Sequence, residues 1–378
     1  MKLNKTKLLI LSDWYLPAVN AGGPVRSVSA IVTALKLDFE ISLLTRDRDF
    51  GSTEAFPHIE ADIWIKKDGF RLQYISPSKI NEIVKREIQL DYDKIYMNSL
   101  FSFPFTINPL RNLSKDDKRQ KVILAPRGML GKGALELKSI KKNIFLFLTK
   151  TLGLYQNITW HASTVLEKKE IQEVFGNNVN VFSIENMAAC TLEPFKPLEK
   201  MENDLKLIFV SRLSPKKNLK FLLELVSQLN FKVSLDIYGP IEDKYYWSSC
   251  KAILGNSNQK IEYKGILDPD DLVSVISNYH LFVFPTLNEN FGHIILETLN
   301  SSVPIILSNQ TPWLNLENCY AGKELSLRSK EEWVNWLNKF YQMGKLEYQK
   351  WREGAWVLSK NKLEQNDLVN QYINMFSE

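Results

Sequence analysis

The chain has 378 residues, of which 44% are hydrophobic and 24% are charged, and its formal net charge is +5. This length exceeds what one hydrophobic core usually serves, so we expect two globular domains. The mild positive charge does not indicate a nucleic-acid partner, and the three scattered cysteines, Cys190, Cys250 and Cys319, have the spacing of neither a disulfide framework nor a zinc motif.

The N-terminal segment and the apolar runs bear on where the protein acts. The apolar run after the first lysines is too short for a signal peptide, and no stretch approaches the roughly 20 apolar residues of a membrane span. Cysteines without a disulfide framework fit a reducing compartment. We therefore expect a cytoplasmic protein.

The first half of the chain alternates short apolar strands with helical patterns. A strand is predicted at residues 8–11, then a loop containing Gly22 and Gly23, then a helix at residues 25–35. Further strands are predicted at residues 40–45, 94–97, 122–124, 158–161 and 179–184. Strands that alternate with helices indicate βαβ units and a parallel sheet. Residues 1–190 are thus predicted to form an N-terminal Rossmann-like domain.

The second half repeats this alternation after a polar segment with two prolines, residues 191–204, which we interpret as a linker. Strands are predicted at residues 205–210, 233–238, 261–263, 281–285 and 304–307. Helices are predicted at residues 219–229, 269–277, 291–301, 331–343 and over most of the chain after 347. Residues 205–358 would form a C-terminal Rossmann-like domain, so the fold class is α/β with two doubly wound halves and a cleft between them.

Two glutamates, Glu289 and Glu297, bracket a strand–loop–helix segment with Gly292 between them. A loop that enters a helix at a glycine presents free backbone N–H groups and the positive end of the helix dipole, which favours a phosphate. The carboxylates cannot favour the same phosphate, so we expect them to meet hydroxyls or a cationic centre. Phosphate and hydroxyls together indicate a nucleotide-sugar.

Two cations, Arg212 and Lys217, follow the first strand of the second half. Together they would neutralise a pyrophosphate, arginine through its fork of donors and lysine as a point charge; the alternative is a solvated basic loop. In the first half, Gly22 and Gly23 would let the backbone approach a ligand closely, or would form an ordinary turn. The dinucleotide pattern Gly-x-Gly-x-x-Gly does not occur there, which disfavours an oxidoreductase.

Histidines and Asp-x-Asp pairs are candidates for catalytic or metal sites, but so short an acidic pattern is expected by chance in a chain with 43 acids. His161 stands at a predicted strand end and stays open between a structural and a functional role, and His293 gains weight from the two flanking glutamates. His58 and His280 are interpreted as structural or surface residues. No cluster has metal-ligand spacing, so we predict that no metal takes part.

A lysine-rich stretch, residues 132–155, mixes basic and apolar residues at helical spacing. A basic amphipathic helix of this kind can lie on an anionic membrane. The alternative is a surface helix whose apolar stripe packs on the sheet. We predict weak association with an anionic membrane.

Five motifs in the second half resemble, in order and spacing, those of the retaining glycosyltransferases of family 4 (group 1), which have the GT-B fold. The motifs are Phe209-Val210-Ser211-Arg212-Leu213, then Lys217, Tyr238-Gly239, Gly265-Ile266-Leu267, and the pair Glu289 and Glu297 with Gly292. The resemblance implies two Rossmann-like domains that face a central cleft, and a C-terminal helix, residues 359–378, that crosses back to the first domain. The stretches Pro126 to Leu130 and Trp160 to Ser163 resemble the subgroup that builds bacterial exopolysaccharides and lipopolysaccharides.

The resemblance also implies roles for the matching residues. Arg212 and Lys217 would hold the donor diphosphate, and Glu289 would contact the transferred sugar; these three are the predicted catalytic residues. Glu297 would bind the nucleotide ribose. The other predicted donor-binding residues are Gly22, Gly23, Arg127, Gly239, Ile266, Leu267, Asn290, Phe291, Gly292 and His293. Asn98 and His161 would lie on the acceptor side of the N-terminal domain.

Two positions depart from the family pattern. Arg127 stands where many relatives carry a histidine near the donor sugar, and Asn218 stands where a glycine commonly follows the lysine. The first departure bears on the choice of sugar. The second bears on the conformation of the loop.

The resemblance implies retaining transfer from a nucleoside-diphosphate sugar, UDP- or GDP-linked, to a saccharide acceptor that is lipid-linked, in bacterial surface polysaccharide synthesis. No cofactor, metal or nucleic acid would be required, and the protein would act in the cytoplasm at the inner face of the cell membrane. Two alternatives remain from the sequence: a catalytically silent scaffold subunit of a polysaccharide assembly complex, and a nucleotide-sugar epimerase on the same fold.

Overall fold

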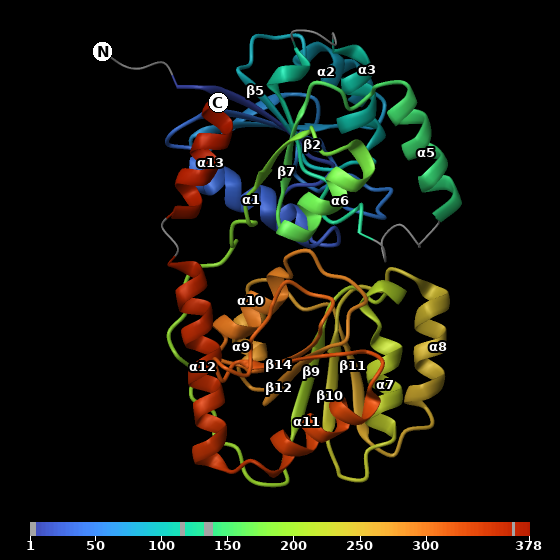
Figure 1. The fold of residues 1–378 in the computed structure, drawn as a ribbon, viewed down its shortest axis with the longest axis vertical. Coiled ribbons are helices and arrows are strands. Elements are labelled where there is room, and N and C mark those ends of the chain that lie inside the picture. The colour runs from blue at the N-terminus through green and yellow to red at the C-terminus, as the bar shows by residue number, and fades with distance from the viewer. Residues whose placement is uncertain (1–4, 114–117, 132–138, 365–366) are drawn as a thin grey trace. The chain divides into compact units, whose positions relative to one another are not determined.

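The computed structural model describes residues 5–113, 118–131, 139–364 and 367–378, and the chain forms two compact units (Figure 1). Unit 1 comprises Met1–Ala189 together with Asn366–Glu378, and unit 2 comprises Cys190–Gln365. Each unit contains one sheet, with helices packed against it (Figure 1).

The sheet of unit 1 has the strand order β3-β4-β2-β1-β5-β6-β7-β8, and only the outer pair, β3 and β4, is antiparallel. Its strands are β1 (Lys7–Leu11), β2 (Glu40–Arg46), β3 (Trp64–Lys67), β4 (Phe70–Ile75), β5 (Lys94–Met97), β6 (Val122–Leu124), β7 (Thr159–Ala162) and β8 (Asn180–Ser183). Its α-helices are α1 (Gly23–Leu35), α2 (Ile80–Glu87), α3 (Asn108–Asn112), α5 (Ser139–Thr151), α6 (Val165–Phe175) and α13 (Asp367–Ser377), with a π-helical turn at Phe103–Ile107 and a 3₁₀ turn at Arg119–Lys121.

The side chains of strand β1 show that this sheet is covered on both faces. Successive side chains of a strand point to opposite faces, and Leu8 to Leu11 are all fully buried. Leu9 and Leu11 belong to one hydrophobic cluster and Leu8 and Ile10 to another, so each face has its own core. A continuous apolar run is what a parallel strand covered by helices on both faces requires.

The C-terminal helix α13 belongs to unit 1 because its apolar face completes one of these clusters. Tyr372, Met375 and Phe376 are fully buried or nearly so and pack with Leu8 and Ile10. Figure 1 shows α13 beside α1. The return begins later than the predicted residue 359, because α12 continues as one helix to Leu363 and keeps its packing in unit 2.

The sheet of unit 2 is parallel throughout, with the order β11-β10-β9-β12-β13-β14. Its strands are β9 (Lys206–Val210), β10 (Ser234–Tyr238), β11 (Lys260–Gly265), β12 (Leu281–Phe284), β13 (Ile305–Ser308) and β14 (Gly322–Leu325). Its α-helices are α7 (Leu219–Ser227), α8 (Lys244–Leu254), α9 (Leu272–Ile276), α10 (His293–Asn300), α11 (Lys330–Gln342) and α12 (Lys345–Leu363), with a 3₁₀ turn at Pro215–Lys217. The order reverses between β9 and β12, which makes this position the topological switch point of a doubly wound sheet.

The segment predicted as a linker, residues 191–204, contains no helix or strand and is attached to unit 2. The N–H of Glu193 donates to Asn300 Oδ1 at 3.0 Å, and Trp356 Nε1 donates to the Glu193 carbonyl at 2.7 Å. Lys200 is buried and its ammonium donates to the carbonyls of Met201, Tyr341 and Met343 at 2.9–3.1 Å. The segment is thus an irregular part of unit 2 that hydrogen bonds hold in place.

Among the elements that the sequence prediction missed are the antiparallel pair β3–β4, helix α8 and strand β14. Strands β3 (Trp-Ile-Lys-Lys) and β14 (Gly-Lys-Glu-Leu) lie at the outer edges of their sheets, where part of each strand stays exposed. Edge strands of this kind lack the apolar run that identifies a buried strand.

Candidate functional site

The carboxyl edge of the unit 2 sheet brings two predicted residues together at the switch point. Lys217 follows β9 and Glu289 follows β12, which are neighbours in the sheet. Lys217 Nζ lies 2.5 Å from Glu289 Oε2. Because ligands of open α/β sheets bind outside the carboxyl ends of the strands at the switch point, this ion pair marks the candidate site.

The Lys217–Glu289 pair is nearly buried, with side-chain exposures of 11% and 15%. The second carboxylate oxygen of Glu289 accepts the N–H of Asn290 at 3.1 Å. Burial by itself raises the pKa of Glu289, but the charges of Lys217 and Lys216 and these hydrogen bonds leave the pKa below its usual value. Glu289 is therefore ionised, and it meets a cationic centre, one of the two partners that the sequence predicted for it.

Hydrogen bonds hold the loops after β9 and β12 against each other. The N–H of Leu287 donates to the Lys216 carbonyl at 2.9 Å, and Asn218 Nδ2 donates to the Pro285 carbonyl at 3.0 Å. Asn218 has a φ of 56°, in the left-handed region that glycine and asparagine tolerate best. The asparagine thus keeps the conformation that a glycine would adopt and adds a bond between the loops.

Helix α10 begins at His293, two residues later than predicted, because Gly292 precedes it in a left-handed conformation with a φ of 78°. A Cβ at Gly292 would lie 2.6 Å from Ile295 Cδ1 and 3.1 Å from Glu289 Cγ. Trp313 Nε1 donates to the carbonyl of the buried Phe291 at 2.6 Å. The positive end of α10 is thereby held next to the Lys217–Glu289 pair.

The other predicted residues of unit 2 follow strands at the carboxyl edge of the sheet or lie on α10. Arg212 donates to Glu242 Oε1 at 3.2 Å, and both side chains are about a third exposed, at 31% and 29%. Glu297 and His293 lie on α10 and are buried, and Ile266 and Leu267 follow the outermost strand, β11. The structure thus places all the predicted residues of unit 2 at one sheet edge or on α10, and their roles toward a donor stay predictions.

Gly239 joins the loops after β9 and β10. Its φ is 134°, and a Cβ would lie 1.9 Å from the Ser211 carbonyl oxygen. The N–H of Leu213 donates to the Pro240 carbonyl at 2.8 Å in the same contact. Only glycine allows these two loops to approach so closely.

In unit 1, the predicted residues Arg127 and Asn98 form one network at the carboxyl edge of the sheet. Arg127 Nε donates to Asn98 Oδ1 at 2.6 Å, and the same guanidinium donates to Tyr96 Oη at 2.6 Å and to Asn186 Oδ1. Asn98, Arg127 and Asn186 follow β5, β6 and β8. Gly22 and Gly23 stand at the start of α1 at the same edge, and Gly22 has a φ of 69°.

His161 is placed differently from its predicted contact with an acceptor. It is 1% exposed, and its Nδ1 and Nε2 lie 2.7 Å from Tyr96 Oη and 2.9 Å from the Ile184 carbonyl. With both ring nitrogens bonded inside unit 1, His161 does not contact an acceptor directly. It positions Tyr96, which in turn holds Arg127.

His161 predicts a loss of stability in acid. Burial, followed by the charge of Arg127, lowers the pKa of His161 from 6.5 to about 3, against a hydrogen bond to Ile184 that raises it. Because the unfolded chain takes up this proton first, the stabilising contribution is complete above pH 6.5 and is lost as the pH falls toward 3, by roughly 2 kcal/mol between pH 6.5 and 5. Urea midpoints at pH 7.5 and 5 should therefore differ less in His161→Gln than in the unsubstituted protein.

The exposed His58 is the control for this experiment. His58→Gln should show the same acid loss as the unsubstituted protein. An equal acid loss in His161→Gln would contradict the assignment of a buried, neutral His161.

Several residues of these networks were missed from the sequence: Tyr96, Asn186, Glu167 and Glu242. Glu167 accepts the N–H of Ser163 at 2.7 Å and also that of Gly128 at 2.5 Å, so it ties together the loops after β6 and β7. Asn186 carried a usable signal, because it follows a predicted strand as Asn98 and Arg127 do. Glu167 and Glu242 carried none, since each is one acid among many.

The described residues contain neither a candidate metal cluster nor a candidate membrane helix. No group of three or more His, Cys, Asp or Glu side chains in them is arranged to hold a metal ion. No helix in the described part of the chain is long and apolar enough to cross a membrane.

Comparison with known proteins finds one matching family and a similar sequence. Residues 192–346 match the family described as glycosyl transferases group 1. A segment of 110 residues is 27% identical to O-antigen chain mannosyltransferase B of Escherichia coli and spans 28% of this chain and 28% of that protein.

Similar solved structures extend over the whole chain. The Anabaena protein HepE in complex with UDP and glucose has a TM-score of 0.73 at 14% identity, over 98% of this chain and 99% of HepE. WaaG, a glycosyltransferase involved in lipopolysaccharide biosynthesis, has a TM-score of 0.65 at 12% identity, over 98% of this chain and 99% of WaaG. The predicted fold class is thus confirmed: the chain has the GT-B fold with two parallel-sheet domains. The match of residues 192–346 to the group 1 family supports a GT-B glycosyltransferase.

Proposed function

We propose that the protein is a retaining, metal-independent glycosyltransferase of family 4. It would move a sugar from a UDP- or GDP-sugar to a saccharide acceptor that is lipid-linked, in the synthesis of a bacterial surface polysaccharide. The observation that carries the proposal is the Lys217–Glu289 pair beside the N-terminus of α10, at the switch point of the unit 2 sheet. All three features lie within the group 1 domain.

The chemistry of this site suits a leaving diphosphate. As the bond to the sugar breaks, negative charge grows on the diphosphate and positive charge on the sugar ring. Lys217, Arg212 and the positive end of α10 would stabilise the first, because they are held in place before the reaction. The ionised Glu289 would lie beside the sugar and stabilise the second.

Retention of configuration follows if the leaving diphosphate itself guides the acceptor to the face that it vacates. The cations of this chain would then supply the charge that many transferases take from a metal. Transfer that persists in excess EDTA is the expected outcome.

The names of similar proteins support a nucleotide-sugar donor and a surface polysaccharide product. HepE was solved with UDP and glucose, which favours a UDP-sugar, whereas the E. coli protein is named as a mannosyltransferase of O-antigen. WaaG acts in lipopolysaccharide biosynthesis. From the O-antigen and lipopolysaccharide roles in these names we infer a lipid-linked acceptor at the cytoplasmic face of the membrane.

Nucleotide binding tests the proposal directly. Thermal unfolding would be followed with UDP, GDP, ADP, CMP and NAD, each at millimolar concentration. A ligand at 100 times its dissociation constant adds about 2.7 kcal/mol of stability, so one nucleoside diphosphate should raise the midpoint clearly and the effect should vanish in Lys217→Ala. No rise with any nucleotide would instead favour a catalytically silent scaffold subunit, and conversion of the donor without an acceptor would favour an epimerase.

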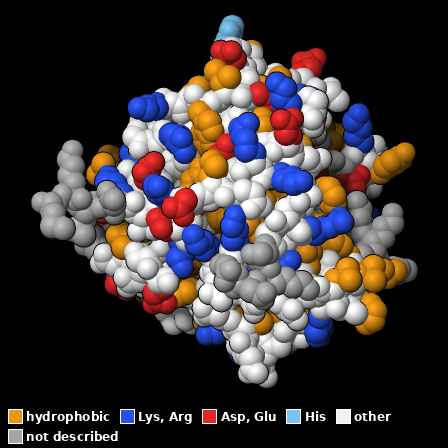
Figure 2. Space-filling model, turned by 90° about the horizontal axis from the view of Figure 1, so that it is seen from above, with side chains coloured by type: hydrophobic (Ala, Val, Ile, Leu, Met, Phe, Trp, Pro, Cys, Tyr) orange, Lys and Arg blue, Asp and Glu red, His pale blue; other side chains and the backbone are white. Residues whose placement is uncertain are grey.

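Helix α5 supports the membrane part of the proposal. Leu146 packs in the core, while Ile144, Phe147 and Leu148 are 55%, 69% and 51% exposed. Figure 2 shows hydrophobic side chains and basic side chains together on the side of unit 1 where α5 lies in Figure 1. One stripe thus packs on the sheet and another is open to an anionic membrane; residues 132–138 of the predicted basic stretch lie outside the described residues.

Flotation with vesicles checks this contact. Phe147→Glu with Leu148→Glu should reduce binding to vesicles of phosphatidylcholine and phosphatidylglycerol severalfold, because two carboxylates replace apolar area and repel the surface. Leu346→Glu is the matched control, since Leu346 is 82% exposed but lies on α12. Equal flotation of the unsubstituted protein with anionic and neutral vesicles would refute the contact.

A further inference from the structure

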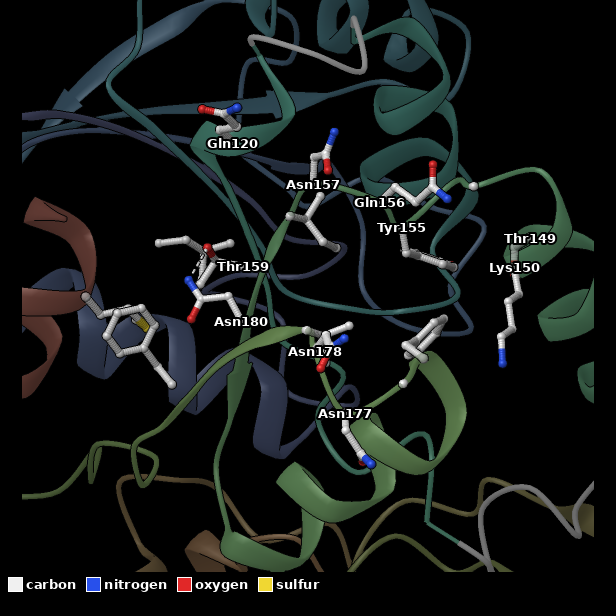
Figure 3. Close-up of a pocket in the computed structure, with 18 of the residues that line it drawn as sticks. Gln120, Thr149, Lys150, Tyr155, Gln156, Asn157, Thr159, Asn177, Asn178 and Asn180 are labelled. Carbon is white, nitrogen blue, oxygen red and sulfur yellow. Dashed lines mark hydrogen bonds between the residues drawn. The ribbon is translucent and has the colours of Figure 1, made fainter.

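A large cavity of mixed polar and apolar lining lies at the amino-terminal edge of the unit 1 sheet, with a volume of about 990 Å³ (Figure 3). Lys94, Thr159 and Asn180, the first residues of β5, β7 and β8, line it. Asn98 and Arg127 lie at the opposite, carboxyl ends of the same sheet. The cavity is therefore a separate place from the residues predicted to meet the substrates, and its size is that of a small-molecule site.

Amide side chains dominate the polar lining. They are Gln120, Gln156, Asn157, Asn177, Asn178 and Asn180. Figure 3 shows Gln156 and Lys150 on one side, Thr159 and Asn180 on the other, and Asn178 between them. An amide both donates and accepts hydrogen bonds, which matches a hydroxyl group, since a hydroxyl does the same.

Several of these amides are available to a ligand. Within the described residues, the side chains of Gln156, Asn177 and Asn178 make no hydrogen bond to the protein. Asn180 uses its Nδ2 to donate to Thr159 Oγ1 at 3.2 Å and keeps its carbonyl oxygen (Figure 3). Three of the six amides and the carbonyl oxygen of Asn180 are therefore available to a ligand, and all six residues are exposed.

The remaining lining argues against an anionic ligand and for one with apolar faces. Among the described residues that line the cavity there is no arginine, the usual residue of phosphate and carboxylate sites. Its two cations are Lys150 and Lys94, and the charge of Lys94 is opposed by Glu378. Tyr155 and Phe175 meet edge to face at 5.2 Å, and Phe182 joins them in the lining. Aromatic rings beside amides suit a molecule that has C–H faces and hydroxyl edges.

We propose that this cavity binds a neutral oligosaccharide. The binding step stands on the cavity alone. Its use rests on the proposed function: the cavity holds a segment of the saccharide acceptor away from the end that receives the new sugar. Such a contact would favour long acceptors over short ones through additional binding.

The test is binding to immobilised neutral tetrasaccharides of mannose, glucose, galactose and rhamnose, with a sulfated tetrasaccharide as the anionic comparison. Asn177→Ala with Asn178→Ala should weaken binding roughly tenfold, through the loss of two hydrogen-bonding groups. Asn335→Ala is the control, since Asn335 is exposed on α11 in unit 2. Unchanged binding in the double variant, no binding of any neutral tetrasaccharide, or preference for the sulfated one would overturn the proposal.

Binding is measured without nucleotide and repeated in Lys217→Ala, so it does not depend on transfer. Retained binding in Lys217→Ala is expected, because Lys217 belongs to unit 2 and the cavity to unit 1. Binding by a protein that transfers no sugar would remove the proposed function and leave the cavity as a saccharide site. Sugar transfer by a protein that binds no tetrasaccharide would support the proposed function and remove the cavity as a saccharide site.

Discussion

Replacement of Lys217 by alanine is expected to lower the turnover of sugar transfer by on the order of 10²–10³, the usual cost of removing one preorganised group that stabilises transition-state charge. Lys217 Nζ is the cation held at the switch point, 2.5 Å from Glu289 and 5.2 Å from the centre of the Phe284 ring. The measurement is steady-state transfer with the nucleotide-sugar identified by thermal unfolding. Lys220→Ala, on the exposed face of α7, should retain normal turnover.

A second variant separates catalysis from stability. Lys217→Ala leaves the nearly buried Glu289 without its closest cation, which should cost about 3 kcal/mol of stability. Removing both partners in Lys217→Ala with Glu289→Ala should restore much of that stability without restoring turnover. If Lys217→Ala and Arg212→Ala both fold and both transfer sugar at nearly normal rates, the diphosphate assignment is wrong.

Replacement of Gly239 by alanine is expected to be the most damaging single methyl group at the candidate site, with a loss of about 3–5 kcal/mol. The added Cβ would lie 1.9 Å from the Ser211 carbonyl, and the φ of 134° is strained for any other residue. The backbone at this contact cannot shift easily, because the loops after β9 and β10 are hydrogen-bonded to each other on both sides of it. The urea midpoint of unit 2 is the measurement.

Gly255→Ala is the matched control for Gly239→Ala. Gly255 ends α8 in an ordinary right-handed conformation, and a Cβ there would meet only the Lys251 carbonyl, at 3.7 Å. This substitution should shift the midpoint little or raise it slightly, because alanine restricts the unfolded chain. Equal losses from the two substitutions would refute the steric argument at Gly239.

The predictable parts of the fold are those in which the residue pattern along the chain agrees with the burial that tertiary packing imposes. Apolar runs such as Leu8 to Leu11 identified the buried parallel strands, because those strands are covered on both faces. Arg212 and Lys217 were candidates because polar residues that follow such strands end up at the carboxyl edge, whereas Asn98 and Arg127 were candidates through the family resemblance. Strands β3 and β14 escaped prediction because an edge strand needs no continuous apolar run.

The sequence by itself determined the α/β class, two alternating series of elements, and the residue types available at each strand end, since these depend on periodicity and order along the chain. Tertiary structure alone decided which of those residues meet. Lys217 and Glu289 are 72 positions apart and become partners because the strand order reverses between β9 and β12. His161 became a buried positioning residue because Tyr96 and the Ile184 carbonyl occupy its two nitrogens. Burial and partnership arise from contacts between distant segments, and no local pattern encodes them.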